Sequence, residues 1–174
     1  LSEEWLLERP PMDFWAFEDM LALPDPEWLI EGLLMEQSSA LLFGGSNTFK
    51  SFLGIDMLMC LSTGADWHGV EITKPRRCVY VATEGSRGVG GVRIPGWAQS
   101  KGIEGDVLKN VLVHHEDIAL DNPQSVEAFI KTCTYWRALH DIEAGKNRVT
   151  DQDPRGAVDL VIIDIFGASM DGCE

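Results

Sequence analysis

The chain has 174 residues, of which 45% are hydrophobic, so it can bury the core of one ordinary domain and is too apolar to be disordered throughout. Its 28 acidic residues outnumber 14 basic ones and give a net charge of -14. Such a chain repels polyanions on average, which argues against a simple DNA-coating protein, and any phosphate or nucleic acid must be bound through local geometry or a local basic cluster.

The cysteines and the apolar runs predict a cytoplasmic protein without a membrane partner. Cys60, Cys78, Cys133 and Cys173 form no C-x-x-C motif, and we interpret all four as reduced thiols. The N-terminus lacks the basic and apolar segments of a signal peptide. No apolar run reaches the roughly 18 residues that a membrane-spanning helix needs.

Residues 1–23 are acidic and aromatic and are interrupted by Pro10 and Pro11. They predict an N-terminal arm that packs on the domain or on a neighbouring subunit, with an irregular extension as the alternative. Residues 24–28 have the proline and aspartate chemistry of a turn. We therefore expect the folded domain to occupy residues 24–174.

Four apolar runs predict buried strands, at residues 40–43, 78–82, 111–113 and 159–164. Helices are expected from residue 50 to the helix-ending Gly64, over residues 92–101 with Pro95 as an alternative start, and over residues 124–139. Polar residues 143–156 predict a mobile surface loop. Strands that alternate with helices predict an α/β fold of three layers, with a mainly parallel sheet covered on both faces.

The turn between the first predicted strand and helix carries a phosphate-loop pattern, G-x-x-x-x-G-K-[ST], in Gly44, Gly45, Ser46, Asn47, Thr48, Phe49, Lys50 and Ser51. Backbone N–H groups of such a loop, together with the positive end of the helix, can bind the phosphates of ATP. We expect Lys50 to contact the β- and γ-phosphates and Ser51 to bind Mg²⁺. The alternative is a glycine-rich turn with a solvated lysine.

Phe49 stands where the pattern has its second glycine. Glycine allows strained backbone angles and a close approach to phosphate. The sequence therefore predicts that Phe49 adopts a negative φ or bears a strain cost.

Two acidic residues follow predicted strands. Asp164 ends the most apolar run, where a carboxylate can hold Mg²⁺ together with Ser51, since ligands of open α/β sheets bind beyond the carboxyl ends of the strands. Glu84 follows the strand at residues 78–82 and is expected to orient the attacking water. Glu84 and Lys50 are the two candidate catalytic residues. The alternatives are an aspartate that caps a turn and a solvated loop glutamate.

In this order, these residues resemble the RecA-like P-loop ATPases, and among them the RepA-type hexameric replicative helicases of plasmids and phages. The resemblance covers residues 26–174 and includes residues 28–32, 42–51, 63–69, 79–85 and 159–164. It implies an ATP-driven motor on nucleic acid (DNA), a homo-oligomer with its nucleotide between the subunits of a ring, Glu84 activating water and Asp164 binding magnesium.

RecA-like domains continue with further strands after the position of Asp164. The resemblance therefore implies a domain that is incomplete at its C-terminus. No sensor residue, DNA-contacting loop or arginine finger is carried over to this chain.

Other functions fit fewer residues. A nucleotide-dependent assembly module with little or no hydrolysis is favoured by Phe49. A small-molecule kinase would need a lid and an acceptor pocket, which the sequence does not indicate. Residues 85–91 lack the order G-x-G-x-x-G of a dinucleotide-binding fingerprint.

The remaining polar and aromatic signals are weaker. His114 and His115 are adjacent on a predicted strand, so they point to opposite faces and do not favour a metal site. Arg87 and Arg93 are candidates for contacts with phosphates or with a neighbouring subunit. The alternative is that they lie at a solvated helix start. Trp97 and Trp136 are interpreted as core residues, and Val126, Phe129, Ile130 and Cys133 are expected on one helix face.

Overall fold

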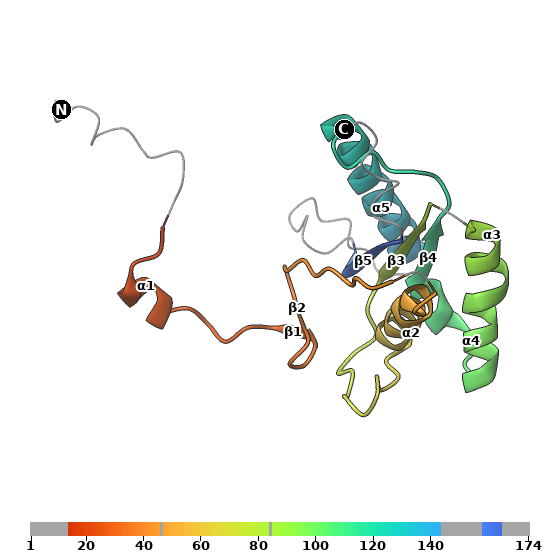
Figure 1. Cartoon of the computed structure of the whole chain (residues 1–174), viewed down its shortest axis with the longest axis horizontal. Helices are drawn as coiled ribbons and strands as arrows, with labels where there is room; N and C mark the ends of the chain where they lie inside the picture. Colours follow the sequence, from red (N-terminus) through yellow and green to blue (C-terminus); the bar gives the residue numbers. More distant parts are fainter. Residues whose placement is uncertain (1–13, 46, 84, 144–157, 165–174) are drawn as a thin grey trace.

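The computed structural model describes residues 14–45, 47–83, 85–143 and 158–164 (Figure 1). Along the chain lie α1 (Phe17–Leu21), β1 (Trp28–Ile30), β2 (Leu34–Met35), α2 (Lys50–Thr63), β3 (Cys78–Ala82), α3 (Ser86–Gly88), the π-helical turn η2 (Val89–Arg93), α4 (Ile94–Lys101), the 3₁₀ helix η3 (Asp106–Asn110), β4 (Val111–His114), α5 (Pro123–Glu143) and β5 (Leu160–Asp164).

A parallel sheet with the strand order β4-β3-β5 forms the centre of the domain. Cys78 at the start of β3 pairs with Val111 of β4 and with Leu160 of β5. All residues of β3 are buried, whereas those of β4 and β5 are mostly half-buried. The predicted strands at residues 78–82, 111–113 and 159–164 and their parallel arrangement are thus confirmed.

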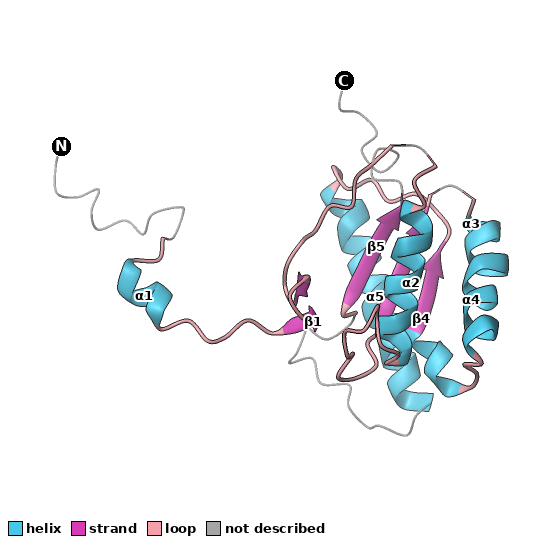
Figure 2. Cartoon of the chain, turned by 60° about the horizontal axis from the view of Figure 1, so that its bottom comes forward, coloured by secondary structure: helices cyan, strands magenta, loops and turns pink. Residues whose placement is uncertain are grey.

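Helices cover both faces of this sheet, as predicted (Figure 2). Alternate residues of β3 point to opposite faces: Cys78, Tyr80 and Ala82 pack in one cluster with α2 and α4, and Val79 and Val81 pack in another with α5. The described residues therefore form three layers, with α2 and α4 on one side and α5 on the other.

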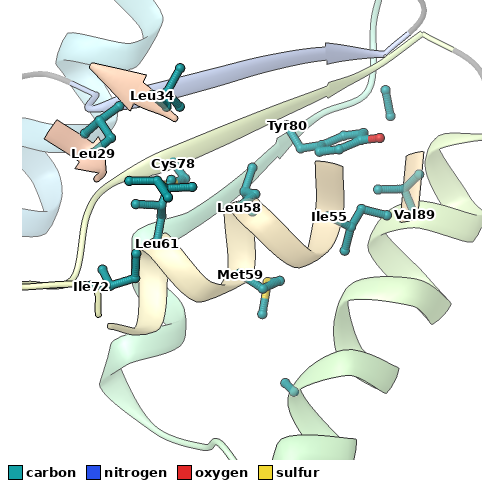
Figure 3. Packing of buried hydrophobic residues seen from close by; sticks show 13 residues of the cluster. Leu29, Leu34, Ile55, Leu58, Met59, Leu61, Ile72, Cys78, Tyr80 and Val89 are labelled. Carbon is teal, nitrogen blue, oxygen red and sulfur yellow. The ribbon is translucent and has the colours of Figure 1, made fainter. Parts of the chain in front are cut away.

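Helix α2 begins at Lys50 and ends at Gly64, which adopts a left-handed conformation with φ 75°. It buries Ile55, Leu58 and Met59 in the core, and Figure 3 shows Leu58 on the strand side of the helix and Met59 on the side away from the strands. Gly54 faces the sheet, since a β-carbon there would make ordinary van der Waals contacts with Ile162 at 3.7 Å and with the Tyr80 ring at 3.9 Å. The first turns of α2 are therefore seated directly on β3 and β5.

The antiparallel hairpin of β1 and β2, which the sequence did not predict, packs at the other end of this core. Leu29, Ile30 and Leu34 are buried in the same cluster as α2. A buried arginine, Arg76, joins the hairpin to the sheet through ion pairs with Glu36 (2.6 Å) and with Asp159 at the start of β5 (3.4 Å).

The prediction of a strand at residues 40–43 is wrong. These residues form an exposed loop, with the Phe43 side chain 83% exposed, and pair with none of the described strands. Figure 2 shows the segment running along the β5 side of the sheet without joining it. An apolar run becomes a strand only where a neighbouring edge accepts its hydrogen bonds, and this segment has no such partner among the described residues.

The helix predicted at residues 92–101 begins earlier. Helical structure starts at Ser86 and continues through η2 into α4, because Val89 is buried and anchors the glycine-rich turn in the core. Pro95 lies in the first turn of α4, directly after the π-helical turn η2.

The helix predicted at residues 124–139 is the longer α5, whose first turn is capped by the Asn122 side chain. Cys133 is buried and Phe129 packs against the core, but Ile130 is 57% exposed, so it does not share their face. Trp136 is 49% exposed and is not a core residue, whereas Trp97 does pack against the core. The predicted loop at residues 143–156 lies, except for Glu143, outside the described residues.

The described part of the N-terminal arm extends away from the sheet and carries α1 (Figure 1). Its large apolar side chains are exposed: Phe14, Trp15, Phe17, Met20, Leu21 and Leu23. In the described part of the chain, no helix combines the length and apolar content needed to cross a membrane. Cys60, Cys78 and Cys133 are buried free thiols, and burial raises the pKa of Cys60 to about 11; Cys173 lies outside the described residues.

Candidate functional site

The predicted site residues gather at one edge of the sheet. Because β3 and β5 are parallel, their carboxyl ends lie at the same edge, and α2 begins there after the phosphate loop (Figure 2). Lys50 and Ser51 open α2, and Asp164 closes β5. Two predicted residues, Ser46 of the loop and Glu84 after β3, lie outside the described residues.

The Lys50 side chain folds back over the loop. Its ammonium donates hydrogen bonds to the carbonyl oxygens of Gly44 (3.0 Å) and Gly45 (2.7 Å). The Thr48 hydroxyl also donates to the Gly45 carbonyl oxygen, at 2.8 Å. A bound phosphate would have to replace these carbonyl oxygens as the acceptors of the ammonium. The exchange is favourable because a hydrogen bond from an ammonium to a charged phosphate is stronger than one to a neutral carbonyl.

Gly44 is confined by this arrangement. A β-carbon at its position would lie 3.1 Å from the Thr48 hydroxyl oxygen and 3.7 Å from the Cδ atom of Lys50. The tight loop therefore explains the glycine in structural terms, apart from any ligand.

Phe49 adopts the left-handed conformation, with φ 61° and ψ 21°, immediately before α2. The prediction of a negative φ or a strain cost is thus settled in favour of strain, since a β-carbon is disfavoured in this region. Asn47 is also left-handed, with φ 60°, but asparagine tolerates this conformation better. Phe49 thus adopts a conformation that glycine takes without strain.

The Phe49 ring points out of the loop. It is 73% exposed and meets the Phe52 ring edge-on at 5.9 Å between centroids. The Arg93 guanidinium lies over the Phe52 ring, 4.8 Å from its centroid. The ring of Phe49 therefore lies outside the loop, and Arg93 brings a positive charge from η2 to the first turn of α2.

The Tyr80 hydroxyl lies between the two predicted magnesium ligands. It donates a hydrogen bond of 2.6 Å to the Oδ2 atom of Asp164. The Ser51 side chain lies close to the Tyr80 hydroxyl. One buried tyrosine on the central strand is thus bonded to the end of β5 and lies near the start of α2.

The surroundings of Tyr80 keep its hydroxyl protonated. Burial raises the pKa of Tyr80 well above its usual value, and the hydrogen bond to Asp164 and the negative charge of that carboxylate raise it further. The nearby Ser51 hydroxyl and the positive charge of Arg93 act in the opposite direction but do not offset the rise. The phenol is therefore a hydrogen-bond donor throughout the neutral pH range.

The backbone of Asp164 is held by Thr83. Both the amide N–H and the hydroxyl of Thr83 donate to the Asp164 carbonyl oxygen, each at 3.1 Å. With Tyr80 on its carboxylate, Asp164 is fixed at both its main chain and its side chain.

The donor set suits a hard divalent cation. A serine hydroxyl and an aspartate carboxylate are the oxygen ligands that Mg²⁺ takes in sites it shares with a phosphate substrate. Both Ser51 and Asp164 lie near the Tyr80 hydroxyl, and Asp164 is hydrogen-bonded to it.

Tyr80 was not among the predicted site residues, although the sequence held a signal for it. The strand at residues 78–82 is otherwise made of aliphatic residues and cysteine, and a buried tyrosine needs a partner for its hydroxyl. Strand alternation places this residue on the α2 face. The sequence alone could therefore have raised the question of what Tyr80 bonds.

The adjacent histidines lie elsewhere. His114 ends β4 and His115 follows it, so the alternation of a strand does not extend to both, and the two line one cavity of about 220 Å³ between β4 and α5. No group of three or more potential metal-ligating side chains occurs among the described residues.

Comparison with known proteins identifies a family. Comparisons with curated proteins and with solved structures gave no match. A protein-family model described as an AAA domain matches residues 6–174, nearly the whole chain. That match agrees with the phosphate loop ahead of α2 and the parallel α/β sheet, and the chain therefore belongs to the AAA domain family of P-loop ATPases.

Proposed function

We propose that this chain binds ATP with Mg²⁺ at the loop of residues 44–51 and hydrolyses it. The observation that carries the proposal is the convergence of Lys50, Ser51 and Asp164 at the carboxyl edge of the sheet. Lys50 would bind the β- and γ-phosphates, and Ser51 and Asp164 would hold the cation. Membership of the AAA domain family supports ATP binding and hydrolysis in general.

The remaining loop residues would supply backbone contacts to the phosphates. Gly44, Gly45, Ser46, Asn47, Thr48 and Phe49 are the residues proposed for this role. Phe49 has no side-chain acceptor for the first N–H groups of α2, so these donors are available to an anion. Glu84 would orient the attacking water, and catalysis would come mainly from positioning and charge stabilisation.

The work driven by hydrolysis would be movement along nucleic acid. This part of the proposal depends on the resemblance to RepA-type replicative helicases, and Arg87 and Arg93 are its candidate basic contacts. With a net charge of -14, the chain would bind DNA through such local positive charge. We expect single-stranded DNA to increase ATP turnover, and to do so less as the salt concentration rises.

A second function is favoured by one observation, the strained φ of Phe49. If strain keeps the loop from closing around the phosphates, the chain would act as a nucleotide-dependent assembly module with little hydrolysis. Measuring ATP binding and ATP turnover on the same preparation separates the two functions. Turnover that single-stranded DNA stimulates supports the motor, whereas binding without turnover, with or without DNA, supports the assembly module and rejects the motor.

The motor proposal includes a homo-oligomer, for which a ring is one arrangement. The exposed aromatic and aliphatic side chains of residues 14–23 support it, because several large apolar side chains exposed in one segment favour an interaction site. The partner of the arm would be a second copy of the chain.

A further inference from the structure

We propose that Tyr80 is a positioning residue that joins the two magnesium ligands, Ser51 and Asp164, and thereby sets the affinity of the site for its cation. This inference rests on the proposed function, since it assumes a cation between Ser51 and Asp164. It assigns a role to a residue that no phosphate-loop pattern contains.

The position of the Tyr80 hydroxyl is fixed by packing. Tyr80 lies on the central strand and is fully buried. Figure 3 shows its ring between β3 and the first turns of α2, near Ile55 and Val89. The ring also faces Gly54, where a β-carbon would lie 3.9 Å away. A rigid ring in a close-packed core carries its hydroxyl to one place, so the oxygen can serve as a fixed point for both ligands.

The hydrogen bond to Asp164 leaves the other carboxylate oxygen for the cation. Tyrosine has one O–H donor, and it is used on the Oδ2 atom of Asp164. The Oδ1 atom remains a ligand whose direction is set by the Tyr80 contact. Carboxylates that bind metals are commonly oriented by such a second hydrogen bond, and loss of one weakens metal binding by about 10- to 100-fold.

Ser51 would complete the chain of hydrogen bonds. A serine oxygen that coordinates a cation through a lone pair still carries a proton, which needs an acceptor. Because Tyr80 donates its own proton to Asp164, its oxygen is free to accept a proton from the nearby Ser51 hydroxyl. In the order Ser51 to Tyr80 to Asp164 each proton would have an acceptor, and a lone pair of the Ser51 oxygen and the Oδ1 atom of Asp164 would remain for the cation.

The decisive variant is Tyr80→Phe, which removes only the hydroxyl. Binding of Mn²⁺ to the full chain loaded with a non-hydrolysable ATP analogue would be measured by electron paramagnetic resonance. We expect affinity for Mn²⁺ to fall by about 10-fold, while the affinity for the analogue without metal stays within about 2-fold. Equal Mn²⁺ affinity in the variant and the parent chain would overturn the inference.

A control variant separates positioning from packing. Cys78→Ala changes a buried residue on the same strand and the same face, at the end of β3 away from the site. It should lower stability without changing the affinity for Mn²⁺. If Cys78→Ala weakens Mn²⁺ binding as much as Tyr80→Phe does, the effect of Tyr80 is one of packing and the inference fails.

A second measurement works even if Tyr80→Phe does not fold. The chain has two tyrosines, Tyr80 and Tyr135, and Tyr135 is exposed. In a Tyr135→Phe chain labelled with 3-fluorotyrosine, the single ¹⁹F signal reports Tyr80 alone. We expect this signal to shift when Mg²⁺ is added to the chain loaded with the analogue. An unchanged signal on saturation with Mg²⁺ would contradict the inference.

Failure of the inference and failure of the proposed function give different results. If the parent chain binds neither the analogue nor its magnesium complex, the proposed function is wrong. If the parent chain binds both, but Tyr80→Phe leaves the Mn²⁺ affinity unchanged and Mg²⁺ leaves the ¹⁹F signal unchanged, only the role of Tyr80 is wrong.

Discussion

At the scale of single residues, Phe49 holds a left-handed conformation that costs a residue with a β-carbon about 1 kcal/mol or more. Its ring gains little in return, since it is mostly exposed and contacts Phe52 only edge-on. The conformation is therefore imposed by the loop and by the start of α2, and not by the packing of the phenylalanine itself.

Replacing Phe49 by glycine and by alanine isolates the backbone strain. Both changes remove the ring, but only glycine relieves the clash of the β-carbon. We expect Phe49→Gly to be more stable than Phe49→Ala by about 1 kcal/mol in urea unfolding. This difference is the energetic cost of a left-handed conformation for alanine, reduced by the larger conformational entropy that glycine loses on folding. An alanine variant that is as stable as the glycine variant would show that φ is not positive at this position.

The sequence indicated candidate residues for this site but not the contacts between them. Lys50, Ser51 and Asp164 could be selected because lysine, hydroxyl and carboxylate groups follow strands or open a helix in a known spacing. Tyr80 could not be given its partners from the sequence, because the contact joins residues more than 80 positions apart, 164 and 80. Strand alternation gives its face, but only the register of β3 and β5 gives its neighbours.

At the scale of elements, the periodicity of apolar residues and the residues that end helices and strands predicted most of the structure. Residues 78–82 became β3 with the same bounds, and Gly64 ended α2 as expected. Residues 40–43 did not become a strand although they are as apolar, because strand formation depends on a partner edge that local sequence does not show. The hairpin of β1 and β2 was missed since each strand has at most three residues.

The hairpin depends on Arg76, whose charge is shared by Glu36 and Asp159. Arg76→Met keeps most of the side-chain length but leaves two partly buried carboxylates without their cation. We expect the free energy of unfolding in urea to fall by about 2–3 kcal/mol, somewhat less than for fully buried pairs.

A surface ion pair provides the matched control for Arg76. Lys131 pairs with Glu127 at 2.8 Å on α5, and both side chains are well exposed. Lys131→Met should therefore change stability by less than about 0.5 kcal/mol. Equal effects of the two substitutions would show that Arg76 contributes no more than a surface pair.

At the scale of the whole molecule, the domain and the arm differ in the burial of their apolar side chains. The sheet buries its apolar residues in two clusters, one on each face. The arm leaves six large apolar side chains exposed within residues 14–23. Assembly of several copies would cover them, and it would also fit the proposed placement of a nucleotide between subunits.

Light scattering of the full chain tests this assembly. Phe17 and Leu21 lie four residues apart on α1, so they share one face of the helix. We expect Phe17→Ser with Leu21→Ser to lower the molar mass of the assembly towards that of one chain. Ile130→Ser, which changes an exposed apolar residue of α5, should leave the mass unchanged. An arm variant that keeps the parent mass would remove the arm from the interface.

The central claim is that the loop of residues 44–51 binds the phosphates of ATP through Lys50. Calorimetric titration with MgATP would compare the parent chain, Lys50→Ala, and Lys131→Ala as a control for loss of one positive charge. Because a contact between a charged group and phosphate is worth about 1.5–3 kcal/mol, we expect Lys50→Ala to bind about 10- to 100-fold more weakly, and Lys131→Ala to bind as the parent does. Equal affinities in all three chains would contradict the claim.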